Sequence, residues 1–170
     1  MAFNTFIKFT GPDMNAGSTS KGHEGWIEVL SWSHGFTQPT TPTRSHGGGA
    51  TVEKAHHAPF NFQKILDSST DDLLKACWSG KHIDKMEFVA YRSGGDTGAS
   101  QMAVPYLKIE LESCVITDYS LSGGPGDMPA ENVSVNYAKV TYTYNGQDKM
   151  KGTVGADQPV SHDLTTNVVA

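Results

Sequence analysis

Seven histidines are the first side chains in this sequence of 170 residues that could bind a metal ion or carry a proton. His56 and His57 are adjacent in a predicted strand, so their rings point to opposite faces and cannot easily share one ion. His34 and His46 could meet only through a glycine-rich loop, and no carboxylate or third histidine stands at a ligand spacing around them. The sequence therefore predicts no metal site and no cofactor.

Two further patterns contain residue types that hydrolases use. Glu110 and Glu112 share one face of a predicted strand, as glycosidase carboxylates can, but Lys108 continues the same stripe, which favours a solvated or intersubunit face. The run 161–163 contains Ser, His and Asp, yet consecutive residues cannot align a nucleophile, a base and an orienting acid. The sequence contains no GxSxG motif, no P-loop and no complete GxGxxG motif. We therefore expect no catalytic residue and no enzymatic activity.

The elements that would position these residues are almost all strands, which predicts a mainly β protein. Alternating runs rich in β-branched and aromatic residues indicate the strands. They are predicted at 3–9, 26–33, 52–62, 85–92, 104–121, 131–144 and 149–154. Asn145-Gly146 predicts a hairpin turn, and the glycines in 93–98 predict a looser one.

The segment 131–144 alternates as a strand should, but it is apolar or aromatic on both faces. One face carries Val133, Val135 and Tyr137, and the other carries Ala138, Val140, Tyr142 and Tyr144. Such a strand needs cover on both sides, from a second layer, a helix or another subunit. We therefore assign Val140 and Tyr142 to a subunit interface, while the parity that faces the core is left open.

One helix is predicted at 70–79. Ser69 stands at its N-cap, Asp72 completes a capping-box-like pair three residues later, and Gly80 stands where a left-handed residue ends a helix. The apolar stripe consists of Leu73, Leu74, Cys77 and Trp78. This stripe predicts that the helix lies against the sheet or across a barrel mouth.

Composition excludes several classes of partner. A net charge of -5 with 13 Lys and Arg argues against nucleic acid or an anionic membrane as the main partner. No run approaches the roughly 18 apolar residues of a membrane span, and the amino terminus alternates like a strand and not like a signal peptide. Cys77 and Cys114 lack a CxxC or zinc spacing, so we expect core thiols. The length suits a single domain over 1–170.

Two segments are expected to form long irregular connections. Segment 37–50 contains two prolines and three consecutive glycines, with no large apolar residue to anchor it to a core. Loops of this length in compact domains are usually functional or disordered. Segment 122–129 is a second glycine-rich connection.

Six segments, in the same order and at ordinary spacing, resemble the haemolysin-coregulated protein (Hcp) family of the type VI secretion system. They are FIKF, IEVLSWSHGFTQP, KILDSSTDDLLKACWSGKHI, YLKIELESCVITDYSLSGG, ENVSVNYAKVTYTY and DLTTN. The resemblance spans nearly the whole chain. It implies a small antiparallel β-barrel of two packed sheets, with one short α-helix on its side and a long extended loop. It also implies a structural role, in which homohexameric rings stack into the tube of a contractile, phage-tail-like injection machine.

The resemblance also implies roles for particular residues. The family's extended loop reaches a neighbouring ring or subunit, and 37–50 matches it in position, although it is richer in proline than expected. The inter-ring residues are then Gln38, Pro39, Pro42, Arg44, Gly47, Gly48 and Gly49. By analogy with a lumen lined by small polar side chains, Ser31 and Ser33 are expected to face the lumen, with ordinary barrel-end serines as an equal alternative.

The implied partners are further copies of the chain, the sheath and spike proteins of the secretion system, and small effectors in the lumen. The protein would be cytoplasmic before firing and would then be secreted without a cleaved signal peptide. A phage or phage-like tail-tube protein is one alternative. A secreted carbohydrate-active or carbohydrate-binding β-barrel that uses Glu110 and Glu112 is the other. Rings at high concentration would favour the tubes, whereas a monomer that binds sugar saturably would favour the last.

Overall fold

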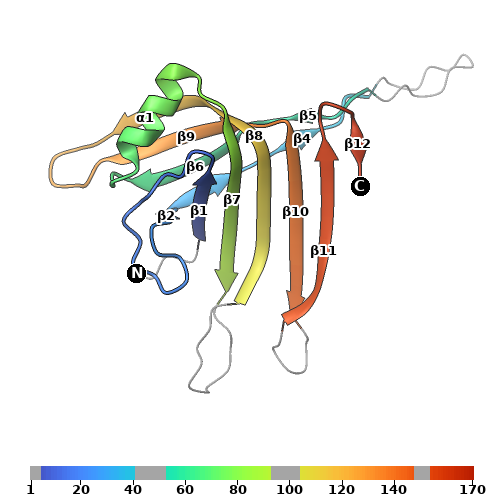
Figure 1. Ribbon diagram of the computed structural model, residues 1–170, viewed down its shortest axis with the longest axis horizontal. Coiled ribbons are helices and arrows are strands. Elements are labelled where there is room, and N and C mark those ends of the chain that lie inside the picture. Colours follow the sequence, from blue (N-terminus) through green and yellow to red (C-terminus); the bar gives the residue numbers. More distant parts are fainter. Residues whose placement is uncertain (1–4, 41–52, 93–103, 148–153) are drawn as a thin grey trace, which may run out of the picture.

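The computed structural model describes residues 5–40, 53–92, 104–147 and 154–170, and its elements are almost all strands (Figure 1). The strands are β1 (Thr5–Thr10), β2 (Ile27–Glu28), β3 (Ser31–Ser33), β4 (Phe36–Thr37), β5 (His56–His57), β6 (Phe60–Ile65), β7 (Ile83–Arg92), β8 (Val104–Ser122), β9 (Ala130–Asn136), β10 (Lys139–Gln147), β11 (Val154–Asp163) and β12 (Val168–Val169), and the helix is α1 (Thr70–Ser79). Among the described residues, no helix is long and apolar enough to cross a membrane.

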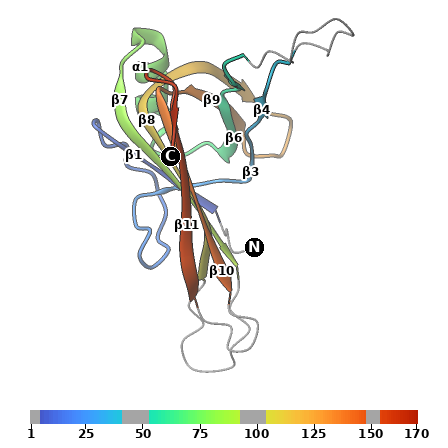
Figure 2. The same cartoon turned by 90° about the vertical axis from the view of Figure 1, so that its right-hand side faces the viewer.

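Two antiparallel sheets share the long strand β8. The larger sheet has the order β12-β11-β10-β8-β7-β1-β2, and β3, β6 and β9 continue from the other half of β8 as a smaller sheet. Residues 104–112 of β8 pair with β7 and β10, whereas 115–122 pair with β9. Ser113 lies between these halves with φ at 54°, a left-handed conformation that redirects the strand. Figure 2 shows β8 curving from the larger sheet into the smaller one.

The core lies between the two sheets. Its members include Ile7, Phe9, Ile27, Phe60, Phe62, Met86, Phe88, Ile109, Leu111, Val133 and Val135. Trp32 packs on this core with its ring centroid 4.7 Å from that of Phe88 and 5.9 Å from that of Phe60. Each fully buried side chain of this size contributes roughly 1.5–3 kcal/mol. The predicted fold class, mainly antiparallel β with one short helix, is confirmed.

The segment 131–144 is not one strand with two covered faces. It forms β9 and β10, which belong to different halves of the β8 pairing and are separated at Tyr137 and Ala138. Up to Tyr137 the odd-numbered residues are buried, whereas in β10 the buried residue is Val140. The alternation therefore changes phase between the two strands. The apolar residues on both faces of 131–144 therefore come from two strands, β9 and β10, whose buried residues alternate in opposite phase.

The strand predicted at 26–33 is also two strands. Ile27 in β2 is buried and pairs with β1, while β3 pairs with β6. Trp32 points into the core, whereas Ser31 and Ser33 are exposed. The chain therefore crosses from one sheet to the other here, and the two serines do not share a face with the buried residues before them.

The antiparallel pair that Asn145-Gly146 predicts is confirmed as β10 and β11, but the turn is not at these residues, because β10 continues to Gln147. The Asn145 side chain donates to the Asp157 carboxylate of β11 at 2.7 Å, and the register shifts between Asn145 and Gln147. Gly146 therefore occupies a bulge. Most of β11 was not predicted, since its residues are largely polar. The predicted turn at 93–98 lies outside the described residues.

The helix is confirmed at Thr70–Ser79, and Gly80 ends it with φ at 61°. Its buried residues are Leu73 and Ala76, and it packs against β8. The predicted apolar stripe is wrong at Trp78, whose side chain is 79% exposed. The helix therefore packs against β8 with Leu73 and Ala76 and leaves the large aromatic ring of Trp78 in solvent.

A buried ion pair lies beneath the amino-terminal end of the helix. Lys64 and Glu131 are both 0% exposed and bind each other directly, and Lys64 also lies 3.0 Å from Asp67. The Tyr119 hydroxyl donates to Glu131, so these contacts join β6, β9 and β8. Ser69 stands at the N-cap as predicted, but its hydroxyl donates to Asp67 and makes no capping hydrogen bond to the helix.

Candidate functional surfaces

The outward face of the smaller sheet carries short, mostly uncharged polar side chains. The uncharged polar residues considered on this face are Ser31, Ser33, Asn61, Gln63, Ser120, Asn132, Ser134 and Asn136, and the half-buried Val115 and Ile65 share the face at its two ends. Ser134 donates to the Asn61 side chain at 2.5 Å, and Ser31 donates to Gln63 at 3.3 Å. These hydroxyl and amide groups can both donate and accept hydrogen bonds. We call this set the polar wall.

The polar wall includes both serines that the sequence singled out, and both are exposed. The sequence did not identify the amide side chains of β6 and β9, because only the strand pairing brings them beside β3. Asp118 pairs with Ser134 at the β8 edge and is the charged residue of the described part of this face. The wall therefore has little net field to attract or repel a charged chain.

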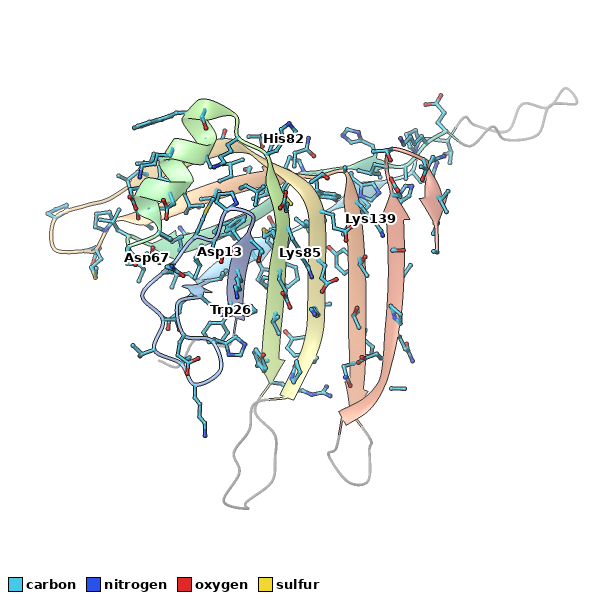
Figure 3. The ribbon with its side chains drawn as sticks, viewed as in Figure 1. Asp13, Trp26, Asp67, His82, Lys85 and Lys139 are labelled. Carbon is cyan, nitrogen blue, oxygen red and sulfur yellow. The ribbon has the colours of Figure 1, made fainter. Side chains whose placement is uncertain are left out.

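The outward face of the larger sheet is different, because lysines and carboxylates alternate across its strands. Lys85, Glu112 and Lys139 stand opposite one another on β7, β8 and β10. Figure 3 shows Lys85 and Lys139 on this broad face. Such exposed pairs contribute roughly 0–1 kcal/mol each. The arrangement is typical of a solvated sheet face.

Glu110 is held as an ion pair within this charged face. Lys108 lies 2.9 Å from Glu110 and 3.0 Å from Glu87, and Lys85 lies 3.1 Å from Glu110. The hydrogen bond from Lys108 is the main cause that lowers the pKa of the Glu110 carboxyl. A general acid of a glycosidase needs a raised pKa instead. Glu110 and Glu112 therefore belong to the charged face and not to a catalytic pair.

The inner side of β10, β11 and β12 exposes apolar side chains. Figures 1 and 2 show these strands extending beyond the smaller sheet. We call the set Phe36, Tyr144, Val160 and Val169 the apolar overhang, with exposed fractions of 49%, 49%, 52% and 68%. Val160 stands opposite Tyr142, and the Phe36 ring lies 5.7 Å from the Tyr142 ring. Contiguous exposed apolar groups of this kind mark interaction surfaces.

The two residues assigned to a subunit interface lie on this inner side, but they differ in exposure. Val140 is 3% exposed and belongs to the core of the single chain, so its side chain has almost no surface for a neighbour. The cause is the phase of β10, which directs Val140 between the two sheets. Tyr142 is half-buried, and its hydroxyl contacts His34. Tyr144, two residues further along the same face of β10, is exposed.

Three histidines join two tyrosines in a chain of hydrogen bonds. His34 contacts Tyr142 through Nδ1 and Tyr137 through Nε2, the latter at 2.5 Å. His57 lies 2.9 Å from the Tyr137 hydroxyl and 2.8 Å from His162. We call this set, with Asn167 at its end, the histidine chain. The sequence did not predict it, since its members are far apart along the chain.

Burial sets the protonation of the histidine chain. It lowers the pKa of His34 from 6.5 to about 4, and with the nearby His162 it lowers the pKa of His57. Burial also raises the pKa of Tyr142 to about 12. His34, His57 and Tyr142 are therefore neutral near pH 7. Within the part of the chain that the structure describes, no group of three or more His, Cys, Asp or Glu is placed to hold a metal ion.

The strands β4 and β5 flank residues 41–52 and form the base of the predicted inter-ring loop. Gln38 and Pro39 are exposed there, and Gln38 donates to the backbone carbonyl of Glu53. A groove of about 590 Å³ lies between this base and Leu164. The other predicted inter-ring residues, Pro42, Arg44 and Gly47 to Gly49, lie outside the described residues.

The fold and the sequence are similar to those of secretion proteins. Residues 6–144 match the family "Type VI secretion system effector, Hcp". The Pseudomonas aeruginosa "Protein hcp1" is 33% identical over 171 residues, covering 100% of both chains. The "Major exported protein" of the same organism is 28% identical over 144 residues, covering 81% of this chain and 77% of that protein. A solved structure of "a type six secretion system protein" has a TM-score of 0.85 at 26% identity, covering 99% of this chain and 100% of that chain.

These similarities define the class as a mainly antiparallel β protein of the Hcp fold, with one short helix. The chain belongs to the Hcp family of the type VI secretion system. It is a secreted structural protein of that system and not an enzyme. The assignment favours the secretion system over the two alternatives, the phage tail tube and the carbohydrate-binding barrel.

Proposed function

We propose that this chain forms a homohexameric ring and that the rings stack into the exported tube of the secretion system. The polar wall is the observation that carries the proposal. A sheet face made mostly of short hydroxyl and amide groups, with Asp118 as its charged member, has little charge with which to bind a partner. Such a surface suits the lining of a channel, past which polypeptide moves without being held.

The apolar overhang supports ring closure. Phe36, Tyr144, Val160 and Val169 lie to one side of the polar wall and lack cover within the described part of the chain. A head-to-tail contact between one subunit's overhang and a different surface of the next generates a closed ring when the rotation closes. Burying each of these side chains would contribute roughly 1.5–3 kcal/mol. Of the two residues assigned from sequence, the half-buried Tyr142 remains in this proposed interface.

The remaining roles follow the same arrangement. Segment 37–50, with Gln38 and Pro39 at its described start, would reach the next ring and join the stack. Ser31 and Ser33 would face the lumen, where small effectors are carried. The sheath and spike proteins would be the other partners, with neither nucleic acid nor direct membrane insertion involved. The protein would be cytoplasmic before contraction and then extracellular or inside the target cell.

Ring closure can be tested with two valines of β11 and β12 that face opposite sides. Val160 lies on the inner side and is 52% exposed, whereas Val168 pairs with Asp163 on the outer side and is 55% exposed. Light scattering after size exclusion should give about six times the 18.3 kDa chain mass for the wild type. Val160→Glu should give monomers, because an unpaired charge in an interface costs about 2–5 kcal/mol. Val168→Glu should keep the ring.

A wild type that is monomeric at all concentrations would contradict the ring. If Val160→Glu and Val168→Glu have the same mass, the apolar overhang is not part of the subunit interface. The lumen has its own test in Ser33→Gln, which should preserve the ring but weaken co-purification of effectors. The control is Ser79→Gln, at an exposed position at the end of α1. Unchanged effector retention in Ser33→Gln would show that Ser33 does not line the path.

Stacking is tested by replacing 40–49 with a short Gly-Ser link. Rings in solution should persist, and the melting temperature should change by a few degrees only, because this segment makes no core contribution in the proposal. Stacked tubes in electron micrographs should disappear, together with secretion-dependent killing. Tubes that form normally would place the joining surface elsewhere, with 122–129 the next candidate.

A further inference from the structure

A second groove, of about 210 Å³, lies between the end of β6 and the segment that precedes β2. It is lined by Gly17, Ser18, Glu28, Ile65, Leu66 and Asp67. Two of these residues are apolar, and they remain partly open to solvent, since Ile65 is half-buried and Leu66 is 38% exposed. Glu28 and Asp67 each add a carboxylate. The groove therefore offers apolar surface and negative charge side by side, and we call it the acidic groove.

The carboxylates of the acidic groove keep oxygens that no other described residue binds. The hydrogen bonds and the ion pair of the Asp67 side chain all use Oδ1, which accepts from Ser69 and lies 3.0 Å from the Lys64 ammonium. Among the described residues, no hydrogen bond or ion pair reaches Asp67 Oδ2 or either carboxylate oxygen of Glu28. Lys64 is also bound by Glu131, so it cannot neutralise the whole set of carboxylates. The groove therefore has unused acceptors and an excess of negative charge.

An arginine side chain has the chemistry that such a groove can bind. Its hydrocarbon stem packs on apolar surface while its charged head stays among polar groups. Its planar guanidinium carries five N–H donors, which can bind more than one carboxylate oxygen at once. A lysine would bring the same charge, but as a point charge without this planar fork. The mixture of apolar and acidic residues therefore favours arginine as the occupant.

The sequence contains one segment whose charge is complementary to the groove. Segment 37–50 has Arg44 as its one Lys or Arg residue, and it contains no Asp or Glu. Its only other basic side chain is that of His46. The segment is therefore positive or neutral along its whole length, and Arg44 is its one permanent charge. Attraction between this segment and the acidic groove has no like-charge repulsion to overcome within the segment.

Arg44 cannot reach the acidic groove of its own chain. The strands β4 and β5 precede the start of β6, whereas the groove lies at the end of β6, and the extended run from His57 to Leu66 spans roughly 30 Å. Arg44 follows Thr40 by four residues, which span at most roughly 14 Å. Figures 1 and 3, drawn in the same view, show Asp67 at the end of the molecule opposite β4 and β5. A contact between the two therefore requires a second copy.

We propose that the acidic groove is the docking site for Arg44 of a second copy of this chain. The guanidinium binds Glu28 and the Oδ2 atom of Asp67, and the stem packs on Leu66. Because each copy offers one segment at one end and one groove at the other, the contact is head-to-tail and can repeat from copy to copy. Its place in the tube rests on the proposed function, in which segment 37–50 joins the rings.

Exchange of the two charges tests the contact in the full-length protein. Arg44→Glu and Glu28→Arg should each keep the ring mass of the wild type in light scattering. Each should raise the protein concentration at which tubes form in electron micrographs by about tenfold or more, because like charges then meet. The double variant should return to within about threefold of the wild type, since the attraction is restored with the signs exchanged. Asp13→Arg is the matched control, because Asp13 is exposed and does not line the groove.

Chemical cross-linking detects the same contact in any assembly that forms. Arg44→Lys keeps the positive charge and supplies an amine, which a carbodiimide joins to a carboxylate in direct contact. Peptide mass spectrometry should find position 44 linked to Glu28 or Asp67. In a mixture of nitrogen-14 and nitrogen-15 protein, these linked peptides should combine the two isotopes, which shows that the link joins two copies. The link between Lys108 and Glu110, which lie 2.9 Å apart, is the internal control for the reaction.

The outcomes separate the docking site from the tube. If the Lys108–Glu110 link forms but position 44 is linked to neither Glu28 nor Asp67, or is linked to them only within one copy, the docking site is wrong whether or not tubes form. Tubes that form at the same concentration in the wild type, Arg44→Glu and Glu28→Arg would also overturn it. A wild type that never forms tubes but gives the link between copies would contradict the stacking and support the docking site.

Discussion

Acidification should destabilise the folded subunit through His34. Burial lowers the pKa of this ring from 6.5 to about 4, and both of its nitrogens are already bonded to tyrosine hydroxyls. Unfolding returns the ring to its ordinary pKa, so the unfolded chain takes up the proton first as the pH falls. The stability is therefore complete above about pH 6.5 and is lost progressively down to about pH 4.

The magnitude follows from these two pKa values. At about 1.4 kcal/mol per pH unit, the difference between them corresponds to a loss of about 3 kcal/mol once both states are protonated. Because the unfolded chain binds more protons than the folded chain in this range, about 2 kcal/mol of this loss occurs between pH 7 and pH 5. That is a large part of the roughly 5–15 kcal/mol that stabilises an ordinary domain.

This loss is measured by urea unfolding at pH 7 and at pH 5. The wild type and His34→Gln are compared at one protein concentration. The single concentration matters because assembly contributes to apparent stability. Carboxylates also titrate in this range, so the informative quantity is the difference between the two proteins. The wild type should lose about 2 kcal/mol more than His34→Gln. His56→Gln should behave like the wild type, and equal losses in the wild type and His34→Gln would refute the reasoning.

Three further results are expected. Glu131→Gln should lower the unfolding free energy by about 1.5–3 kcal/mol in urea titrations, because it removes one of the two carboxylates that bind the buried Lys64 and leaves only Asp67; a loss below about 0.5 kcal/mol would contradict the ion pair. Gly155→Ala should cost about 1–3 kcal/mol, since its Cβ would collide with a β10 carbonyl, whereas Gly17→Ala, with open space around it, should be tolerated on the same thermal scan. Glu110→Gln should change stability by less than about 1 kcal/mol and remove no hydrolytic activity in sugar-release assays.

The sequence predicted the elements that depend on local chemistry. The helix at 70–79 and its glycine stop follow from capping and spacing within a few residues, and both are confirmed. The strand at 104–121 follows from one uninterrupted alternating run, and β8 covers nearly the same residues. The mainly β class follows from the number of such runs. Local patterns of this kind do not need knowledge of partners far along the chain.

The strand boundaries that were wrong lie where the chain changes sheets. At Tyr137 and Ala138, and again between β2 and β3, the alternation changes phase without a glycine or proline to signal it. If segment 131–144 is interpreted as one strand, both of its faces are apolar. For that reason the sequence predicts Val140 at an interface, although it lies in the core.

By itself the sequence determined the fold class, the helix, the family resemblance and the absence of known catalytic motifs. Only the tertiary structure decided which side chains share a surface. It places Asn61 and Ser134 beside the two serines of β3, and it joins His34, His57 and His162 across more than a hundred residues. The physical reason is that strand register and phase are set by pairing with distant strands, so a surface made by several strands is not encoded in any one of them.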